Sequence, residues 1–180
     1  NQGAGSFTRA NAQLLRVSSG TATFGDLDTD GDLDLIITGR PPESSYSARM
    51  YRNDGSGTFS AEEAGLTGVT RSSADLGDVD ADGDLDLILT GDREGSAGSA
   101  TLYENDGAGT FTPANEDLTG VALGSTTFGD FNGDGAIDLA LTGRDGTSTP
   151  TTVLYENAGD GSFTMLTDTL TAVGYSSSDW

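Results

Sequence analysis

The chain has 180 residues and carries 29 acidic against 8 basic side chains, for a formal net charge of −21. All basic residues are arginines and there is no lysine, histidine or cysteine, which excludes an imidazole acid–base catalyst, a thiol nucleophile, a Schiff-base lysine and a His/Cys site for zinc or iron. Nucleic acid and anionic membranes are poor partners for such a charge, and no apolar run approaches the ~20 residues of a membrane-spanning helix.

One sequence pattern recurs every 52 residues. The string Gly-Asp-Leu-Asp-Thr-Asp-Gly-Asp-Leu-Asp-Leu begins at Gly25, and its relatives begin at Gly77 and Gly129. Further in-register sets are Asn1, Asn53, Asn105 and Asn157; Phe7, Phe59, Phe111 and Phe163; Tyr51, Tyr103 and Tyr155; and Phe24, Leu76, Phe128 and Trp180. We therefore treat residues 1–180 as a single repeat region with repeats 1–52, 53–104 and 105–156 and a partial repeat 157–180.

Each repeat is predicted to form four short strands. In the second repeat these are Ser73–Leu76, which runs into an acidic loop, the apolar run Leu85–Thr90, then Ala100–Glu104, and finally Thr110–Pro113. The glycine-rich stretch Asn105–Gly109 predicts a hairpin turn between the third and fourth strands. Helical periodicity is missing, and Glu62–Gly65 would form a single turn at most. Four strands in a repeat of this length are typical of β-propeller blades, so the fold class is all-β.

The ends of the chain leave blades unfinished. Residues 1–17 are expected to supply only a fourth, outer strand, and Thr171–Trp180 only a first, inner strand, with three complete blades from about Ser18 to Leu170 between them. Unpaired strand edges and an apolar face that includes Trp180 would then be exposed, which soluble proteins avoid. We expect other blades of a longer chain, or neighbouring copies of this chain, to cover them.

Three acidic loops follow the pattern D-x-[DN]-x-D-G-x-x-D. Oxygen ligands at alternate positions, with glycine at position six for a sharp turn, are suited to the 6–8 oxygens that calcium requires. Position seven is expected to offer only its backbone carbonyl, because it is alanine in the third loop. The predicted ligands of three calcium ions are Asp26, Asp28, Asp30, Asp32 and Asp34; Asp78, Asp80, Asp82, Asp84 and Asp86; and Asp130, Asn132, Asp134, Ala136 and Asp138.

A solvated acidic loop without metal is the alternative. Two carboxylates ~4 Å apart repel by roughly 4 kcal/mol at an effective dielectric constant near 20, which disfavours such clusters unless a cation is bound. Magnesium demands tighter octahedral geometry, and an EF-hand would need a glutamate where Ile37, Leu89 and Leu141 stand. Because Asn132 replaces an aspartate, the third site is expected to bind calcium most weakly.

These repeats resemble the FG-GAP/VCBS repeats of integrin-α-type β-propellers. The resemblance rests on Phe24-Gly25-Asp26, on Phe128-Gly129-Asp130, on the three acidic loops and on the N-D-G-x-G-x-F turns. It implies calcium in the loop between the first two strands of a blade, ligand contacts on the opposite face, and a secreted or cell-surface protein. Closed propellers of this family commonly have six to eight blades, more than this chain supplies.

The expected function is non-catalytic: adhesion, recognition or assembly by an extracellular, calcium-stabilised propeller. The face opposite calcium would be built from the loops Arg40–Ala48, Asp92–Ser99 and Arg144–Thr152 and connections such as Leu66–Arg71. Candidate contacts to a protein or glycan ligand there are Arg40, Tyr46, Arg71, Arg93 and Arg144, which are equally interpretable as solvated loop residues. Two alternatives remain: a subunit of a self-assembling extracellular fibre, and the propeller of a glycan-active or lipid-cleaving enzyme.

Overall fold

The computed structural model describes residues 13–114, 117–166 and 170–177, which form strands and no helix. No helix there could span a membrane. The strands are β1 (Ala22–Gly25), β2 (Asp34–Gly39), β3 (Ser47–Asn53), β4 (Phe59–Glu62), β5 (Thr70–Gly77), β6 (Asp86–Arg93), β7 (Ser96–Asn105), β8 (Phe111–Pro113), β9 (Ala122–Gly129), β10 (Asp138–Arg144), β11 (Pro150–Asn157) and β12 (Phe163–Met165). Consecutive strands form three four-stranded antiparallel sheets, as the repeat predicted.

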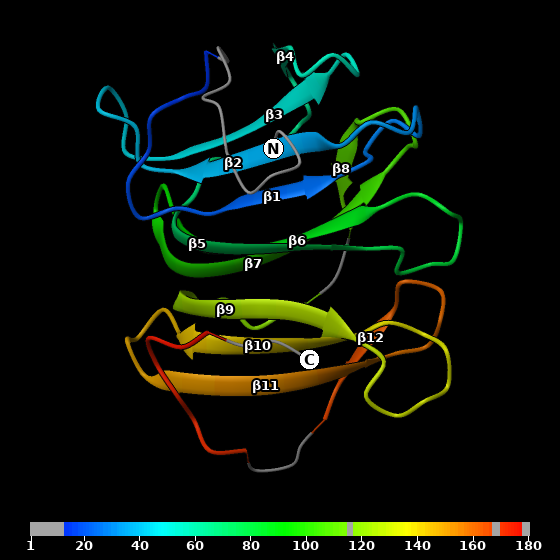
Figure 1. Ribbon diagram of the computed structural model, residues 1–180. Coiled ribbons are helices and arrows are strands. Elements are labelled where there is room, and N and C mark those ends of the chain that lie inside the picture. Colours follow the sequence, from blue (N-terminus) through cyan, green and yellow to red (C-terminus); the bar gives the residue numbers. More distant parts are fainter. Residues whose placement is uncertain (1–12, 115–116, 167–169, 178–180) are drawn as a thin grey trace, which may run out of the picture.

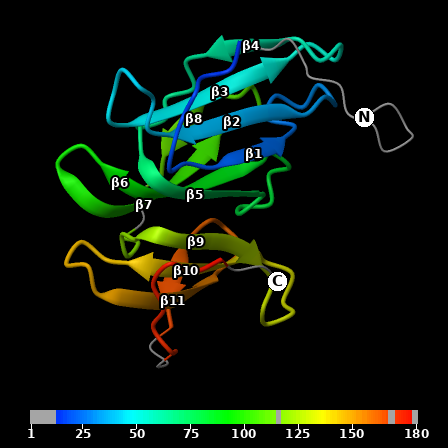
Figure 2. The same cartoon turned by 60° about the vertical axis from the view of Figure 1, so that its left-hand side comes forward.

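The three sheets lie face to face in chain order. Figure 1 shows β1–β4 above β5–β8 and β9–β12 below them, and Figure 2 shows the same order from another side. In Figure 1 the loops that join the first and second strands of each sheet lie on the right, and the hairpins between second and third strands lie on the left. This arrangement of stacked antiparallel sheets is that of β-propeller blades.

The hydrophobic core lies between the sheets. Ile36 of β2 packs on one side with Leu87 and Leu89 of β6, while Ile88 points the other way and packs with Leu139 and Leu141 of β10. The second strand of each sheet is therefore covered on both faces, which explains why its sequence is a continuous apolar run. Each contact between sheets needs residues from two successive repeats.

The recurrent aromatic or leucine at the end of each first strand packs over a glycine of the preceding sheet. A Cβ atom added to Gly25 would come within 2.6 Å of Leu76 Cδ1, and one added to Gly77 within 3.1 Å of Phe128 Cδ2. The pairing of a large apolar residue with glycine in each repeat is thus explained by packing: the large side chain needs the space that the glycine of the previous repeat leaves open.

The expected terminal strands are not present among the described residues. Residues 13–17 carry no strand; Leu15 donates its backbone N–H to the Tyr51 hydroxyl at 2.9 Å, as Thr67 donates to Tyr103 and Thr119 to Tyr155. This segment thus corresponds to the connections that precede β5 and β9. Residues 170–177 also carry no strand. The expected positions of Asn1, Phe7 and Trp180 lie outside the described residues.

We expect the contact between the first two sheets to be sensitive to the residue after the first aspartate of the loop. Leu27 is fully buried between these sheets, whereas Phe131, at the same position of the third repeat, is 37% exposed. Leu27→Ala should lower the free energy of unfolding by about 2–4 kcal/mol through loss of buried surface and a residual cavity. Phe131→Ala is the matched control and should cost less than about 1 kcal/mol. Equal losses in urea-unfolding curves would contradict this assignment.

Candidate metal centre

The three acidic loops join β1 to β2, β5 to β6 and β9 to β10, at one end of the stacked sheets (Figure 1). The glycine at position six has a left-handed backbone in each loop, with φ of 92° at Gly31, 99° at Gly83 and 95° at Gly135. A side chain is strained at such an angle, so the glycine predicted to permit the sharp turn does so.

The first aspartate folds each loop around its own carboxylate. Asp26 accepts the backbone N–H of Asp30 through Oδ1 at 3.1 Å and that of Gly31 through Oδ2 at 3.0 Å. Asp78 and Asp130 accept the corresponding N–H groups in the second and third loops. The side chain of position five in turn accepts the N–H of position seven. These bonds hold carboxylates on the inside of the turn before any cation is added.

The ninth position is the most buried part of each loop. Asp34 and Asp138 are 0% exposed and Asp86 is 1% exposed. In the second loop, Asp86 accepts the Val79 N–H through Oδ2 and the Asn105 N–H through Oδ1, both at 3.0 Å. The same pair of bonds forms at Asp34 and at Asp138. This carboxylate therefore joins the loop to the end of the third strand, besides being a predicted ligand.

The geometry suits a cation in the first two loops. Carboxylate oxygens of Asp26, Asp28 and Asp30 lie within 4.8 Å of one another, and so do those of Asp78, Asp80 and Asp86. In the first loop, Oδ1 of Asp28 is buried and has no hydrogen-bond partner, an arrangement that an added cation would satisfy. Oxygen donors at this spacing could hold a metal ion, which would supply the positive charge that the clusters lack.

The third loop differs from the other two. Its acidic residues do not form such a group among the described residues. Asn132 donates its amide to Asp134 Oδ2 at 2.9 Å and to Glu156 Oε1 at 3.3 Å, and its Oδ1 accepts the Asp134 N–H. The amide thus partly takes the place that a cation would have between these oxygens.

Position seven is turned toward the neighbouring hairpin. A Cβ atom added to Gly55 would meet Asp32 Oδ2, and one added to Gly107 would meet Asp84 Oδ2. The side chains of Asp32 and Asp84 therefore lie against the turn between the third and fourth strands. The expectation that position seven offers a ligand through its backbone carbonyl stays a prediction.

Burial and crowding raise the pKa of several of these carboxyl groups. Burial raises the pKa of Asp86 to about 6, with Asp80 and Asp82 adding repulsion, although the N–H groups of Asn105 and Val79 oppose the shift. The pKa of Asp34 is raised for the same reasons, by burial first. Desolvation and the neighbouring aspartates also raise the pKa of Asp84. A bound cation would favour the ionised form of each group.

Three contributors to the site were not identified from the sequence. Position four also has a left-handed backbone, with φ of 58° at Thr29 and 62° at Ala81. Asn105, at the end of β7, donates its Nδ2 to two loop carbonyls. One is Leu27 O in the β1–β2 loop, at 3.0 Å, and the other is Leu85 O in the β5–β6 loop, at 3.2 Å. Arg52 forms an ion pair with Asp28. The sequence shows that asparagine recurs every 52 residues, but it does not show which carbonyl groups accept the asparagine amide.

On the face opposite the acidic loops, only some of the residues predicted to contact a ligand line one hollow. Arg40, Tyr46 and Arg71 line a hollow of about 280 Å³. Arg71 pairs with Asp92 at 2.9 Å. Arg144 donates to Ser148 O, and its guanidinium lies 5.0 Å from the Tyr175 ring centroid. Arg93 is exposed and does not line this hollow. Two of the four candidate arginines, Arg71 and Arg144, therefore have structural partners for their side chains.

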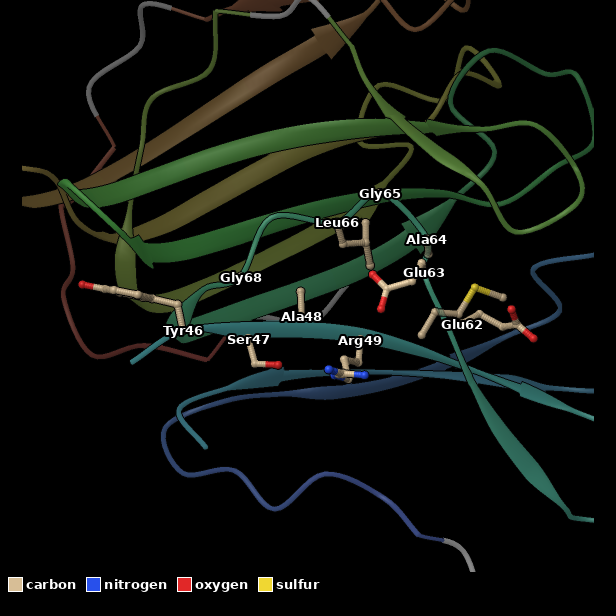
Figure 3. A pocket seen from close by; sticks show the side chains of 11 residues that line it. Tyr46, Ser47, Ala48, Arg49, Glu62, Glu63, Ala64, Gly65, Leu66 and Gly68 are labelled. Atoms are coloured by element: carbon tan, nitrogen blue, oxygen red, sulfur yellow. The ribbon is translucent and has the colours of Figure 1, made fainter. Parts of the chain in front are cut away.

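A second hollow of about 250 Å³ lies on the first sheet. Figure 3 shows that its labelled residues come from two segments: Tyr46–Arg49, at and just before the start of β3, and the connection from Glu62 to Gly68. Both hollows are smaller than the roughly 300–1,000 Å³ of ordinary small-molecule sites. Neither includes a residue of the acidic loops.

Comparison with known proteins identifies the repeats. The family model described as "FG-GAP-like repeat" matches residues 26–89 and 78–141, which together make up more than half of the chain. A search of curated proteins finds no match. A solved structure of a lectin from Agrocybe aegerita, described as recognising non-reducing terminal N-acetylglucosamine, is similar with a TM-score of 0.50 and 19% identity. The similarity covers 81% of this chain and 37% of the lectin, and it supports the propeller fold alone.

The raised pKa of Asp86 predicts how stability depends on pH without divalent cations. Because the folded pKa of about 6 lies above the ordinary 3.8, the ionised buried form destabilises the protein above pH 6, and acidification relieves this. In buffers stripped of divalent cations with a chelating resin, the melting temperature should therefore rise between pH 7 and pH 5.

Asp86→Asn should make this rise smaller. Asp106 is a control, because hydrogen bonds from Thr110 and Ala108 lower its pKa, so it stays ionised in this range. Asp106→Asn should leave the slope unchanged. A melting temperature in the stripped buffers that falls from pH 7 to pH 5 would contradict the assignment.

Proposed function

The chain belongs to the FG-GAP-like repeat family, and on that basis we propose that it is a non-catalytic, calcium-stabilised, extracellular β-propeller repeat protein that acts in adhesion, recognition or assembly. The observation that carries the proposal is the convergence of carboxylate oxygens within 4.8 Å inside loops already folded by their own backbone N–H groups. Each loop would take one calcium ion, three per chain. The ion would stabilise the fold rather than take part in a reaction.

A structural role for calcium follows from the position of the loops. The loop that would hold the ion also places Leu27 or Val79 in the core between two sheets. Ordering the loop therefore orders the contact between blades, and the free energy of binding adds to the free energy of folding. An extracellular location, where calcium is abundant, would keep such sites occupied even at dissociation constants of about 10⁻⁴–10⁻³ M.

The non-catalytic assignment rests on the side chains available. The carboxylates that could act as paired acids and bases lie in the loops, where they are folded against backbone N–H groups. The arginines Arg71 and Arg144 on the opposite face are held by Asp92 and by Ser148 and Tyr175. What this face offers is a polar surface of hairpin loops, which is suited to contact with a protein or glycan ligand.

Assembly has support of its own from the two outer faces of the stack. Phe24 and Leu33 of the first sheet are 57% and 56% exposed, whereas Phe128, the equivalent of Phe24, is buried against the second sheet. On the other side, Phe131 and Tyr175 are 37% and 70% exposed. Because these positions form the contacts between internal blades, further blades of a longer chain or neighbouring copies of this chain are the partners that fit them.

Calcium binding is tested by titration and by removal. Calorimetry with calcium should give three sites per chain, and excess EGTA should lower the melting temperature by about 10 °C or more, because ligand binding to the folded state alone stabilises it. Asp26→Ala with Asp78→Ala should leave one site. Elemental analysis without calcium, together with an unchanged melting curve in EGTA, would contradict the proposal.

Assembly is tested by sedimentation of the 180-residue chain in calcium. We expect association that increases with protein concentration, and Phe24→Asp should weaken it by placing a charge in the contact. Thr112→Asp, on the exposed outer strand of the middle sheet, adds the same charge elsewhere and should have no effect. A monomer that does not associate at any concentration, with or without Phe24→Asp, would show that these faces do not bind blades of another copy.

A further inference from the structure

One strand position lies beside the third position of the acidic loop in the first and third repeats. It is occupied by Arg52 in β3, Glu104 in β7 and Glu156 in β11, always directly before the asparagine of the hairpin turn. Arg52 Nη1 lies 2.5 Å from Asp28 Oδ2, and Glu156 Oε1 accepts the Asn132 amide at 3.3 Å. The first repeat therefore places a cation beside its loop and the third places a carboxylate there, while the second has Glu104 at the same sequence position.

Arg52 is held firmly in this place. Its Nη2 donates to Ala108 O, in the β7–β8 turn of the next sheet, at 2.9 Å, so the guanidinium joins two sheets while it pairs with Asp28. The Asp28 side chain is only 5% exposed and that of Arg52 is 40% exposed, so the carboxylate is shielded from water while the guanidinium stays partly solvated. A calcium ion in the first loop must share Asp28 with this fixed positive charge, whereas no arginine stands at the equivalent position of the other repeats.

The charges around the three loops are consequently unequal. The first loop has the ligand carboxylates Asp26, Asp28, Asp30 and Asp34 together with Arg52, a formal charge of −3. The second loop has Asp78, Asp80, Asp82 and Asp86 together with Glu104, a formal charge of −5. The third loop has Asp130, Asp134 and Asp138 together with Glu156, a formal charge of −4. Calcium affinity in such loops increases with ligand charge.

We propose that the strand position occupied by Arg52, Glu104 and Glu156 sets the relative calcium affinity of the three loops. Arg52 makes the first loop the weakest site, Glu104 makes the second loop the tightest, and Glu156 compensates for Asn132 in the third. The order differs from the expectation based on the loop sequences alone, in which the third site is weakest. This inference rests on the proposed binding of calcium and adds residues outside the loops that determine its strength.

The inference also predicts which contact between blades is least dependent on calcium. The Arg52 side chain already neutralises Asp28 and binds the next sheet through Ala108 O. The first loop therefore keeps a cation of its own when calcium is removed. The second loop has no arginine at the equivalent position, so chelation should leave its carboxylates uncompensated.

The test uses calorimetric calcium titration of the 180-residue chain and single-loop variants to assign the steps. Asp26→Ala should remove the weakest step and Asp78→Ala the tightest. Arg52→Glu, which gives the first repeat the residue of the other two, should tighten the weakest step by about tenfold or more, since it changes two unit charges beside the ion. Glu104→Gln, at an exposed position, should loosen the tightest step and provides a second test if Arg52→Glu does not fold.

Arg49→Gln is the control for net charge, because Arg49 lies on the same strand but lines the hollow on the first sheet, which includes no residue of the acidic loops. It should leave all three binding steps unchanged. The inference is overturned if Arg52→Glu and Glu104→Gln leave the steps unchanged, or if Asp26→Ala removes the tightest step. In those cases calcium would still bind, and the proposed function would stand. Absence of calcium binding by the unmodified chain would instead refute the proposed function, and this inference with it.

Discussion

A buried carboxylate at the ninth loop position holds each blade together. Asp86 accepts one backbone N–H from Val79, inside the loop, and another from Asn105, at the end of the third strand. Desolvation of this charge is costly, as its pKa of about 6 shows, and charge-assisted hydrogen bonds offset part of that cost. A bound cation would offset the remaining desolvation cost by favouring the ionised carboxylate. One side chain thus fixes the relative positions of a loop and two strands that are separate in the sequence.

The same loops connect neighbouring blades. Leu27 follows the first aspartate of its loop and is fully buried against the next sheet, and its backbone carbonyl accepts the side-chain amide of Asn105. In the third sheet, Asn157, at the end of β11, likewise donates its side-chain amide to Val79 O. Because the loop and the contact between blades share these atoms, a change in the conformation of the loop also changes the packing between the blades. Ion binding in the loop and packing of the sheets are therefore coupled.

How much of the fold and of the site could be predicted from the sequence depends on whether a feature is set by neighbouring residues or by contacts between separate segments. The three sheets, the continuous apolar second strands and the glycine at position six were predictable, because spacing along the chain determines them. Arg52 was not, since its role depends on how a strand lies beside a loop of the same repeat. The left-handed backbone at Thr29 was not either, because a β-branched residue ordinarily avoids that conformation. The expected inner strand near the C-terminus is not formed within residues 170–177. The backbone N–H of Tyr175 nevertheless donates to Leu123 O, as the backbone N–H of Arg71 donates to Ser19 O in the preceding pair of sheets.

The placement of the core between sheets has a consequence for how such a chain can change in evolution. Each contact joins a residue to one in the following repeat, as Leu76 joins Gly25 and Phe128 joins Gly77. Duplication or loss of a segment leaves every such pair matched whenever its length is a whole multiple of 52 residues, wherever the break falls. No particular residue marks a boundary of the unit. Recombination between repeats can therefore lengthen or shorten the array without disturbing the packing, provided that the interval is kept.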